Sequence, residues 1–168
     1  LALVRSEADA GQKILMLDEQ FYLFMPNSRR HIRITPMQKL LGEASAGDIS
    51  SLRWSEDYQV VTQTNHGDQI NLHLAAARDG LSYPTMDLVV AADTHEPVSA
   101  VFYLVSGRVA KEAHFQMADE DGYRRLTGMV LQDRIQTSQR TEIEYLSVEP
   151  WDIPASWFNP AFLVRNNL

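Results

Sequence analysis

The chain of 168 residues contains no cysteine. It therefore has no disulfide bond, no thiolate nucleophile and no cysteine-ligated zinc site, although this absence does not identify its redox compartment. No apolar run approaches the roughly 20 residues that a membrane-spanning helix needs, so we predict no transmembrane segment. The net charge of −7 argues against a nucleic acid as partner.

The sequence also lacks the motifs of common enzyme classes. Phosphate-binding glycine loops of the forms GxxxxGK[ST] and GxGxxG are absent. Gly42 lies three residues before Ser45, where a nucleophile elbow requires two. The five histidines are scattered without an HExxH motif, and residues 119–122 lack the remaining ligand positions of a calcium loop. We therefore predict neither an enzyme nor a cofactor or metal site.

The chain instead contains a series of short segments in which apolar and polar residues alternate. Turn residues such as Gly, Asn, Asp and Pro separate them at intervals of roughly 10 to 15 residues, which is typical of an antiparallel meander. We predict a mainly β fold, with strands over residues 14–17, 21–25, 31–34, 58–64, 69–75, 85–91, 97–105, 108–117, 122–134 and 138–148.

Helical signals are few and short. Residues 35–41 have a threonine N-cap, a proline in the first helical position and a glycine beyond their end. Met37, Leu40 and Leu41 would share one face of this helix. Further short turns are expected over residues 48–53 and 154–162. So few helices would leave an apolar sheet face thinly covered, which suggests a cavity. The alternative is a closed barrel or sandwich filled by its own side chains.

Basic side chains gather in residues 29–40, where Arg29, Arg30, Arg33 and Lys39 occur without an acid. The simpler interpretation is the solvent face of an amphipathic strand. The functional interpretation is a patch, formed by Arg29, Arg30 and Arg33, that docks an acidic partner or anionic headgroups near a cavity.

Several segments together resemble the outer-membrane lipoprotein-sorting (LolA-like) family. The resemblance covers about residues 10 to 165, and it depends on the order and spacing of its segments. These are residues 21–26 (FYLFMP), 29–36 (RRHIRITP), 41–48 (LGEASAGD), 57–58 (DY), 97–103 (PVSAVFY) with Ser106, Gly107 and Lys111, 141–143 (TEI) and 154–163.

The resemblance implies a fold and a location. Members of the family are periplasmic and form an antiparallel, incompletely closed half-barrel whose concave apolar face is covered by short helices. We expect residues 1–168 to form a single domain of this kind. The family begins with a long amphipathic helix and further strands that this sequence does not show, so we expect the domain to lack them. No signal peptide is visible.

The resemblance also implies a function, which is to carry lipid or lipoprotein acyl chains between an inner-membrane exporter or receptor and the outer membrane. Met37, Leu40 and Leu41 would form a flap, with Gly42 and Gly47 as hinges. The alternatives are a periplasmic sensor or adaptor that binds a membrane-protein partner, with the cavity as signal input, and a lipid-ester hydrolase, which lacks a nucleophile–base pair. The predicted cavity residues are Leu23, Met25, Ile32, Ile34, Leu72, Leu74, Leu88, Val90, Phe102, Phe115 and Val130.

Overall fold

The computed structural model describes residues 1–5, 10–17, 20–28, 30–35, 39–41, 44–45, 53–120, 122–135 and 140–166. The chain divides into two compact units. Unit 1 comprises Leu1–Gln38, Ala46–Ser50 and Glu149–Leu168, and unit 2 comprises Lys39–Ser45 and Ser51–Val148. The single domain remains a prediction. None of the helices in the described part of the chain is long and apolar enough to cross a membrane.

Unit 1 contains an antiparallel sheet in the order β1-β2-β3-β4. Its strands are β1 (Ala2–Leu3), β2 (Lys13–Leu17), β3 (Gln20–Phe24) and β4 (His31–Ile34). The short helices η1 (Ala155–Phe158) and α3 (Pro160–Arg165) follow at the other end of the sequence. Leu163 of α3 is fully buried against Leu15 and Phe24, so α3 covers one face of this sheet.

Helix α3 begins where the sequence supplies a cap. The Asn159 side chain accepts a hydrogen bond from the Ala161 main-chain N–H at 2.9 Å, and Pro160 occupies the first helical position. Both features favour a helix start. The predicted terminal turn is thus present.

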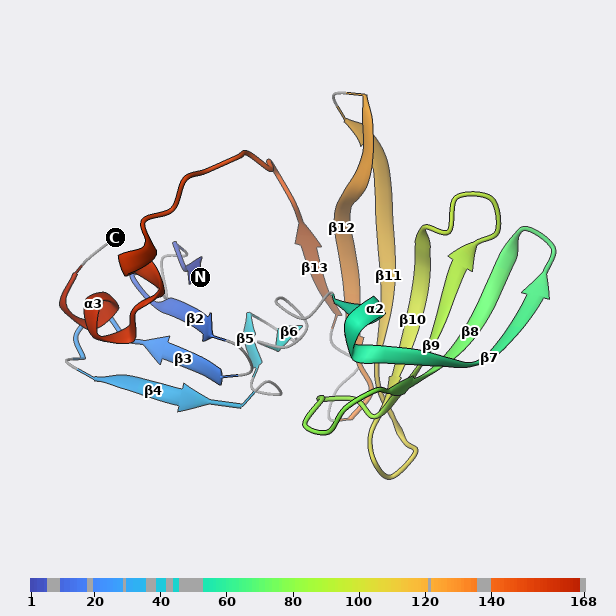
Figure 1. Ribbon diagram of the computed structural model, residues 1–168, viewed down its shortest axis with the longest axis horizontal. Helices are drawn as coiled ribbons and strands as arrows, with labels where there is room; N and C mark the ends of the chain where they lie inside the picture. Colours follow the sequence, from blue (N-terminus) through green and yellow to red (C-terminus); the bar gives the residue numbers. More distant parts are fainter. Residues whose placement is uncertain are drawn as a thin grey trace. The chain divides into compact units, whose positions relative to one another are not determined.

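Unit 2 contains a seven-stranded antiparallel sheet in which each strand pairs with its neighbour in sequence (Figure 1). The short helix α2 (Trp54–Asp57) precedes it. The strands are β7 (Tyr58–His66), β8 (Gln69–Ala76), β9 (Thr85–Ala91), β10 (Pro97–Tyr103), β11 (Val109–Glu120), β12 (Tyr123–Asp133) and β13 (Arg140–Glu144).

The predicted mainly β, antiparallel fold with few short helices is confirmed. One expected helix is not present as such. Lys39–Leu41, at the end of the segment predicted as helical, forms strand β5, which pairs with β6 (Ala44–Ser45). A helix of one or two turns gains little from its own hydrogen bonds, so strand pairing with a nearby segment overrides the local capping signals. Residues 36–38 lie outside the described residues.

Candidate functional site

One face of the seven-stranded sheet is apolar over five adjacent strands. Side chains alternate between the two faces along each strand, and cross-strand partners share a face. Burial follows the same alternation in β9, where Met86 is completely buried and Leu88 and Val90 are nearly so. We call this side the apolar face. It carries Leu72, Leu74, Met86, Leu88, Val90, Ala100, Phe102, Ala113, Phe115, Met129 and Leu131.

Two alanines lie side by side in the middle of the apolar face. Ala100 on β10 and Ala113 on β11 are cross-strand partners. Their neighbours in the same row are the larger Leu88 on β9 and Leu131 on β12. The surface of the sheet is therefore lower at the alanines than beside them. Both alanines are only 1% exposed, so other groups cover this low point.

Two aromatic side chains from outside the sheet contact this face. Trp54 of α2 meets Phe115 edge to face, with ring centroids 5.4 Å apart. Tyr83, in the connection between β8 and β9, contacts Phe102 with ring centroids 4.9 Å apart. Such aromatic pairs contribute about 0.5–1.5 kcal/mol beyond the area that they bury.

A partly buried ion pair holds the end of α2. Arg78 Nε donates a hydrogen bond to Asp57 Oδ1 at 2.9 Å, and Arg78 Nη2 lies 2.8 Å from the same oxygen. Next to it, the Tyr58 hydroxyl donates to the Tyr83 carbonyl at 2.8 Å. Burial and the nearby Asp57 charge raise the pKa of Tyr58 to about 12, although the Arg78 charge acts in the opposite direction. These contacts fix one end of α2 to the loop that carries Tyr83.

The opposite side of the sheet is polar, and a hydrogen-bonded row crosses three of its strands. Asp87 on β9 accepts from Tyr103 Oη and from His73 Nδ1, both at 2.6 Å. Burial alone would raise the pKa of the Asp87 carboxyl, but the bonds from Tyr103 and His73 outweigh it and hold this pKa below its ordinary value. The bond to Asp87, followed by burial, raises the pKa of Tyr103 to about 12. This row ties the strands together on the side away from the apolar face.

Comparison with known proteins identifies the family. A family model described as an uncharacterized protein matches residues 1–165. The chain belongs to this family. No curated protein gives a significant match.

The chain has a LolA-like fold, which confirms the resemblance predicted from the sequence, because a LolA superfamily protein and a lipoprotein-sorting domain are among the solved structures similar to it. A LolA superfamily protein from Nitrosomonas europaea is 26% identical, with a TM-score of 0.79 over 92% of this chain and 73% of that one. An outer membrane lipoprotein-sorting protein domain from Vibrio parahaemolyticus is 19% identical, with a TM-score of 0.74 over 96% and 74% of the two chains. A DUF1329 family protein from Desulfovibrio piger is 18% identical, with a TM-score of 0.74 over 95% and 73%.

In unit 2 of this LolA-like chain, most of the predicted cavity residues share the apolar face. They are Leu72, Leu74, Leu88, Val90, Phe102 and Phe115. Val130 does not belong to them. It is the cross-strand partner of His114, whereas Phe115 pairs with Met129, so Val130 lies on the polar side. The cause is the apolar run Met129-Val130-Leu131, in which alternation cannot be recognised from residue type.

In unit 1 the four predicted cavity residues also share one face of their sheet. Leu23 pairs with Ile32, and Ile34 pairs with Phe21 on the same side, which Met25 continues by alternation. Ile34 is buried, whereas Met25 and Ile32 are 39% and 51% exposed. This is the face opposite to the one that α3 covers.

The flap and the basic patch are only partly within the described residues. Met37, Gly42, Gly47 and Arg29 lie outside them, and Leu40 and Leu41 are part of β5. Arg30 and Arg33 are exposed on unit 1. The flap and the docking patch remain predictions.

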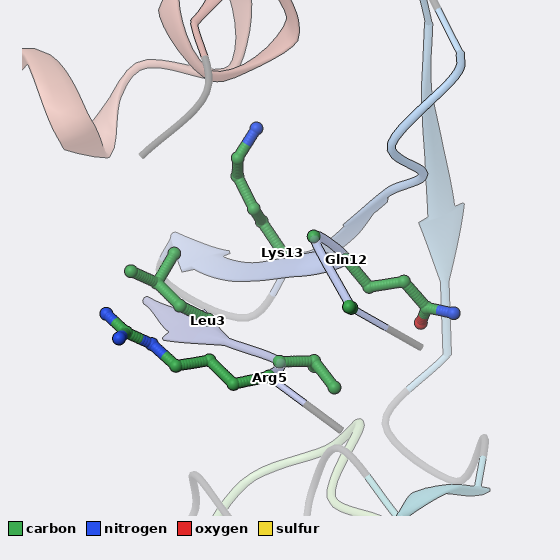
Figure 2. Close-up of a pocket in the computed structure, with 7 residues that line it drawn as sticks. Leu3, Arg5, Gln12 and Lys13 are labelled. Carbon is green, nitrogen blue, oxygen red and sulfur yellow. The ribbon is translucent and has the colours of Figure 1, made fainter. Parts of the chain in front are cut away.

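A pocket of about 260 Å³ lies elsewhere, in unit 1, where the chain turns between β1 and β2 (Figure 2). Leu3, Arg5, Gln12 and Lys13 are among the residues that line it. Its volume is below the roughly 300–1,000 Å³ of typical ligand sites, and Figure 2 shows the Lys13 amine pointing away from Leu3 and Arg5. We therefore place the candidate site on the apolar face and not in this pocket.

Sequence reasoning did not assign the aromatic residues that contact this face. Trp54 directly follows the turn expected over residues 48–53, and its partner Phe115 lies in β11, the fifth strand after α2. Tyr83 lies among turn residues and gave no periodic signal. A tryptophan and a tyrosine in connections next to a sheet with one apolar face are the signal that could have identified them.

Proposed function

We propose that this protein is a periplasmic carrier that binds the acyl chains of lipids or lipoproteins on the apolar face of unit 2. It moves them from an inner-membrane exporter towards the outer membrane. The observation that carries the proposal is the Trp54–Phe115 contact. A short helix that runs directly into β7 places Trp54 against Phe115 of an apolar face that is lowest at its centre.

The free energy gained by burying an acyl chain is sufficient to hold it without a covalent bond. Each methylene group removed from water contributes about 0.8 kcal/mol. A chain of sixteen carbons supplies on the order of 10 kcal/mol before ordering costs. Such a ligand replaces the contacts of Trp54, and its release then becomes the slow step. A membrane partner that displaces the ligand is therefore part of the proposal, as are the flap residues Met37, Leu40 and Leu41 with hinges at Gly42 and Gly47.

Mass spectrometry of organic extracts from the purified protein tests this function. Leu72→Arg places a charge on the apolar face, and we expect it to remove a co-purifying lipid that the parent protein carries. Val130→Arg introduces the same side chain on the polar side of the sheet, and the lipid should remain. Circular dichroism should show that both variants are folded. A parent protein that carries no lipid, and takes none up from vesicles, would contradict the carrier.

A further inference from the structure

Two charged residues are buried on the apolar face. Lys111 on β11 and Asp133 on β12 are cross-strand partners, so their side chains leave the sheet on the same side and within reach of each other. They are 3% and 1% exposed. The next residue in this row is Phe102 on β10, which pairs with Lys111. The apolar rows of the face thus end at a charged pair on two of its strands.

Stability alone does not account for this pair. Taking two charges out of water costs more than their attraction commonly returns, and apolar replacements of similar volume are often neutral or stabilising. Both residues have interaction partners in the protein, and Asp133 Oδ1 accepts a hydrogen bond from the Ile135 main-chain N–H at 2.6 Å. One positive and one negative charge make this end of the apolar face polar without a net charge.

We infer that Lys111 and Asp133 receive the polar end of the bound acyl ligand and select ligands whose polar end has no net charge. This inference rests on the proposed function. An ester or amide carbonyl accepts a hydrogen bond from the Lys111 ammonium and adds no charge. A zwitterionic headgroup places its anion near Lys111 and its ammonium near Asp133. A free fatty acid anion leaves one uncompensated charge in a site of low dielectric, which is strongly unfavourable.

Four ligands with the same sixteen-carbon chain test the selection: methyl hexadecanoate, hexadecanoyl lysophosphatidylethanolamine, hexadecanoate and hexadecylammonium. Each is offered from a cyclodextrin buffer at pH 8, and binding is followed by tryptophan emission, since Trp54 contacts the apolar face. We expect the ester and the zwitterion each to bind at least about tenfold more tightly than either ion.

Two substitutions of similar side-chain size should each improve the binding of one of the two ions. Asp133→Asn keeps the oxygen that accepts from Ile135 and leaves Lys111 unbalanced, so hexadecanoate should bind more tightly and the ester about as before. Lys111→Met leaves Asp133 unbalanced and should favour hexadecylammonium. Glu112→Gln is the matched control. It removes a carboxylate from β11, next to Lys111 but on the polar side of the sheet, and should not change which ligand binds best.

The outcomes separate this inference from the carrier function. If none of the four ligands binds, the proposed function fails. If the wild-type protein binds ions and ester equally, the carrier stands and the charge selection is wrong. If Asp133→Asn weakens all ligands equally, the pair has only a structural role, which also overturns the inference. Where the variants do not fold, the comparison of ligands on the wild-type protein decides alone.

Discussion

Lys13 caps the end of helix α3, where its Nζ donates a hydrogen bond to the Leu163 carbonyl at 3.1 Å. A second bond reaches the Asn166 carbonyl at 2.9 Å. The last carbonyls of a helix have no partner within it, and a cation there is also favoured by the helix dipole. One buried lysine thus attaches α3 to β2.

We expect Lys13→Met to lower the free energy of unfolding of unit 1 by about 1.5–3 kcal/mol, because it removes buried hydrogen bonds from a charged donor. Urea denaturation followed by near-ultraviolet circular dichroism measures the loss. Arg165→Gln removes an exposed cation from the last turn of the same helix and should cost less than about 1 kcal/mol. Equal losses in the two variants would contradict the capping role of Lys13.

The pKa of Asp87 predicts how stability responds to acid. Because this pKa is below its ordinary value of 3.8 in the folded protein, the contribution of Asp87 is complete above pH 3.8 and is lost as the pH falls through the folded pKa. Asp87→Asn should flatten the acid side of the curve of stability against pH. Urea midpoints measured at several pH values between about 5 and 2 test this. An unchanged slope would show that other carboxylates determine it.

Tyr103 gives a spectroscopic test of the same row. Its pKa of about 12 means that the folded protein holds the phenol proton while the unfolded chain loses it near 10.0, so this stabilisation disappears as the pH rises from 10 to 12. In Asp87→Asn, the pKa of Tyr103 should fall towards 10.0. Tyrosinate absorbance reports the change, and Tyr58, whose pKa is raised to about 12 by other groups, should titrate as before.

The anchor of α2 should control access to the apolar face. Arg78→Ala leaves the buried Asp57 carboxylate without its ion pair, which costs about 1–3 kcal/mol or more. We expect α2 to detach and Trp54 to leave Phe115, so that apolar ligands exchange faster. Stopped-flow tryptophan emission during ligand displacement measures the rate. Arg53→Ala removes an exposed arginine of the same region, paired with Glu56, and should leave the rate unchanged.

Charge reversal in the basic patch distinguishes the carrier hypothesis from the sensor or adaptor hypothesis. Arg30→Glu with Arg33→Glu should weaken sedimentation with anionic vesicles, with a dependence on salt, and should not change lipid loading. Arg124→Glu with Arg140→Glu alters the net charge equally on unit 2 and is the control. If the first pair of substitutions removes a protein partner and not vesicle binding, the adaptor function gains support.

Local sequence predicted most strands because alternation and turn residues agree with the final pairing. His31–Ile34 and Thr85–Ala91 have the predicted bounds. Prediction failed where the outcome depends on which strands pair and in which register. The capping signals before Lys39–Leu41 do not show that β6 will pair with it, and the Met129–Leu131 run does not show which of its members faces Phe115. The charged pair on the apolar face also depends on register, because Lys111 and Asp133 meet only when β11 and β12 pair.

The bond from Lys13 to Leu163 joins residues 150 positions apart, whereas every strand of unit 2 pairs with its neighbour in sequence. Pairing of close neighbours is fast, and contacts of large separation form late. The sheet of unit 2 can therefore form early in folding, while Leu15 and Phe24 stay in contact with water until residues 160–165 pack against them. Docking of α3 is then a late step, and it completes the burial of these two side chains.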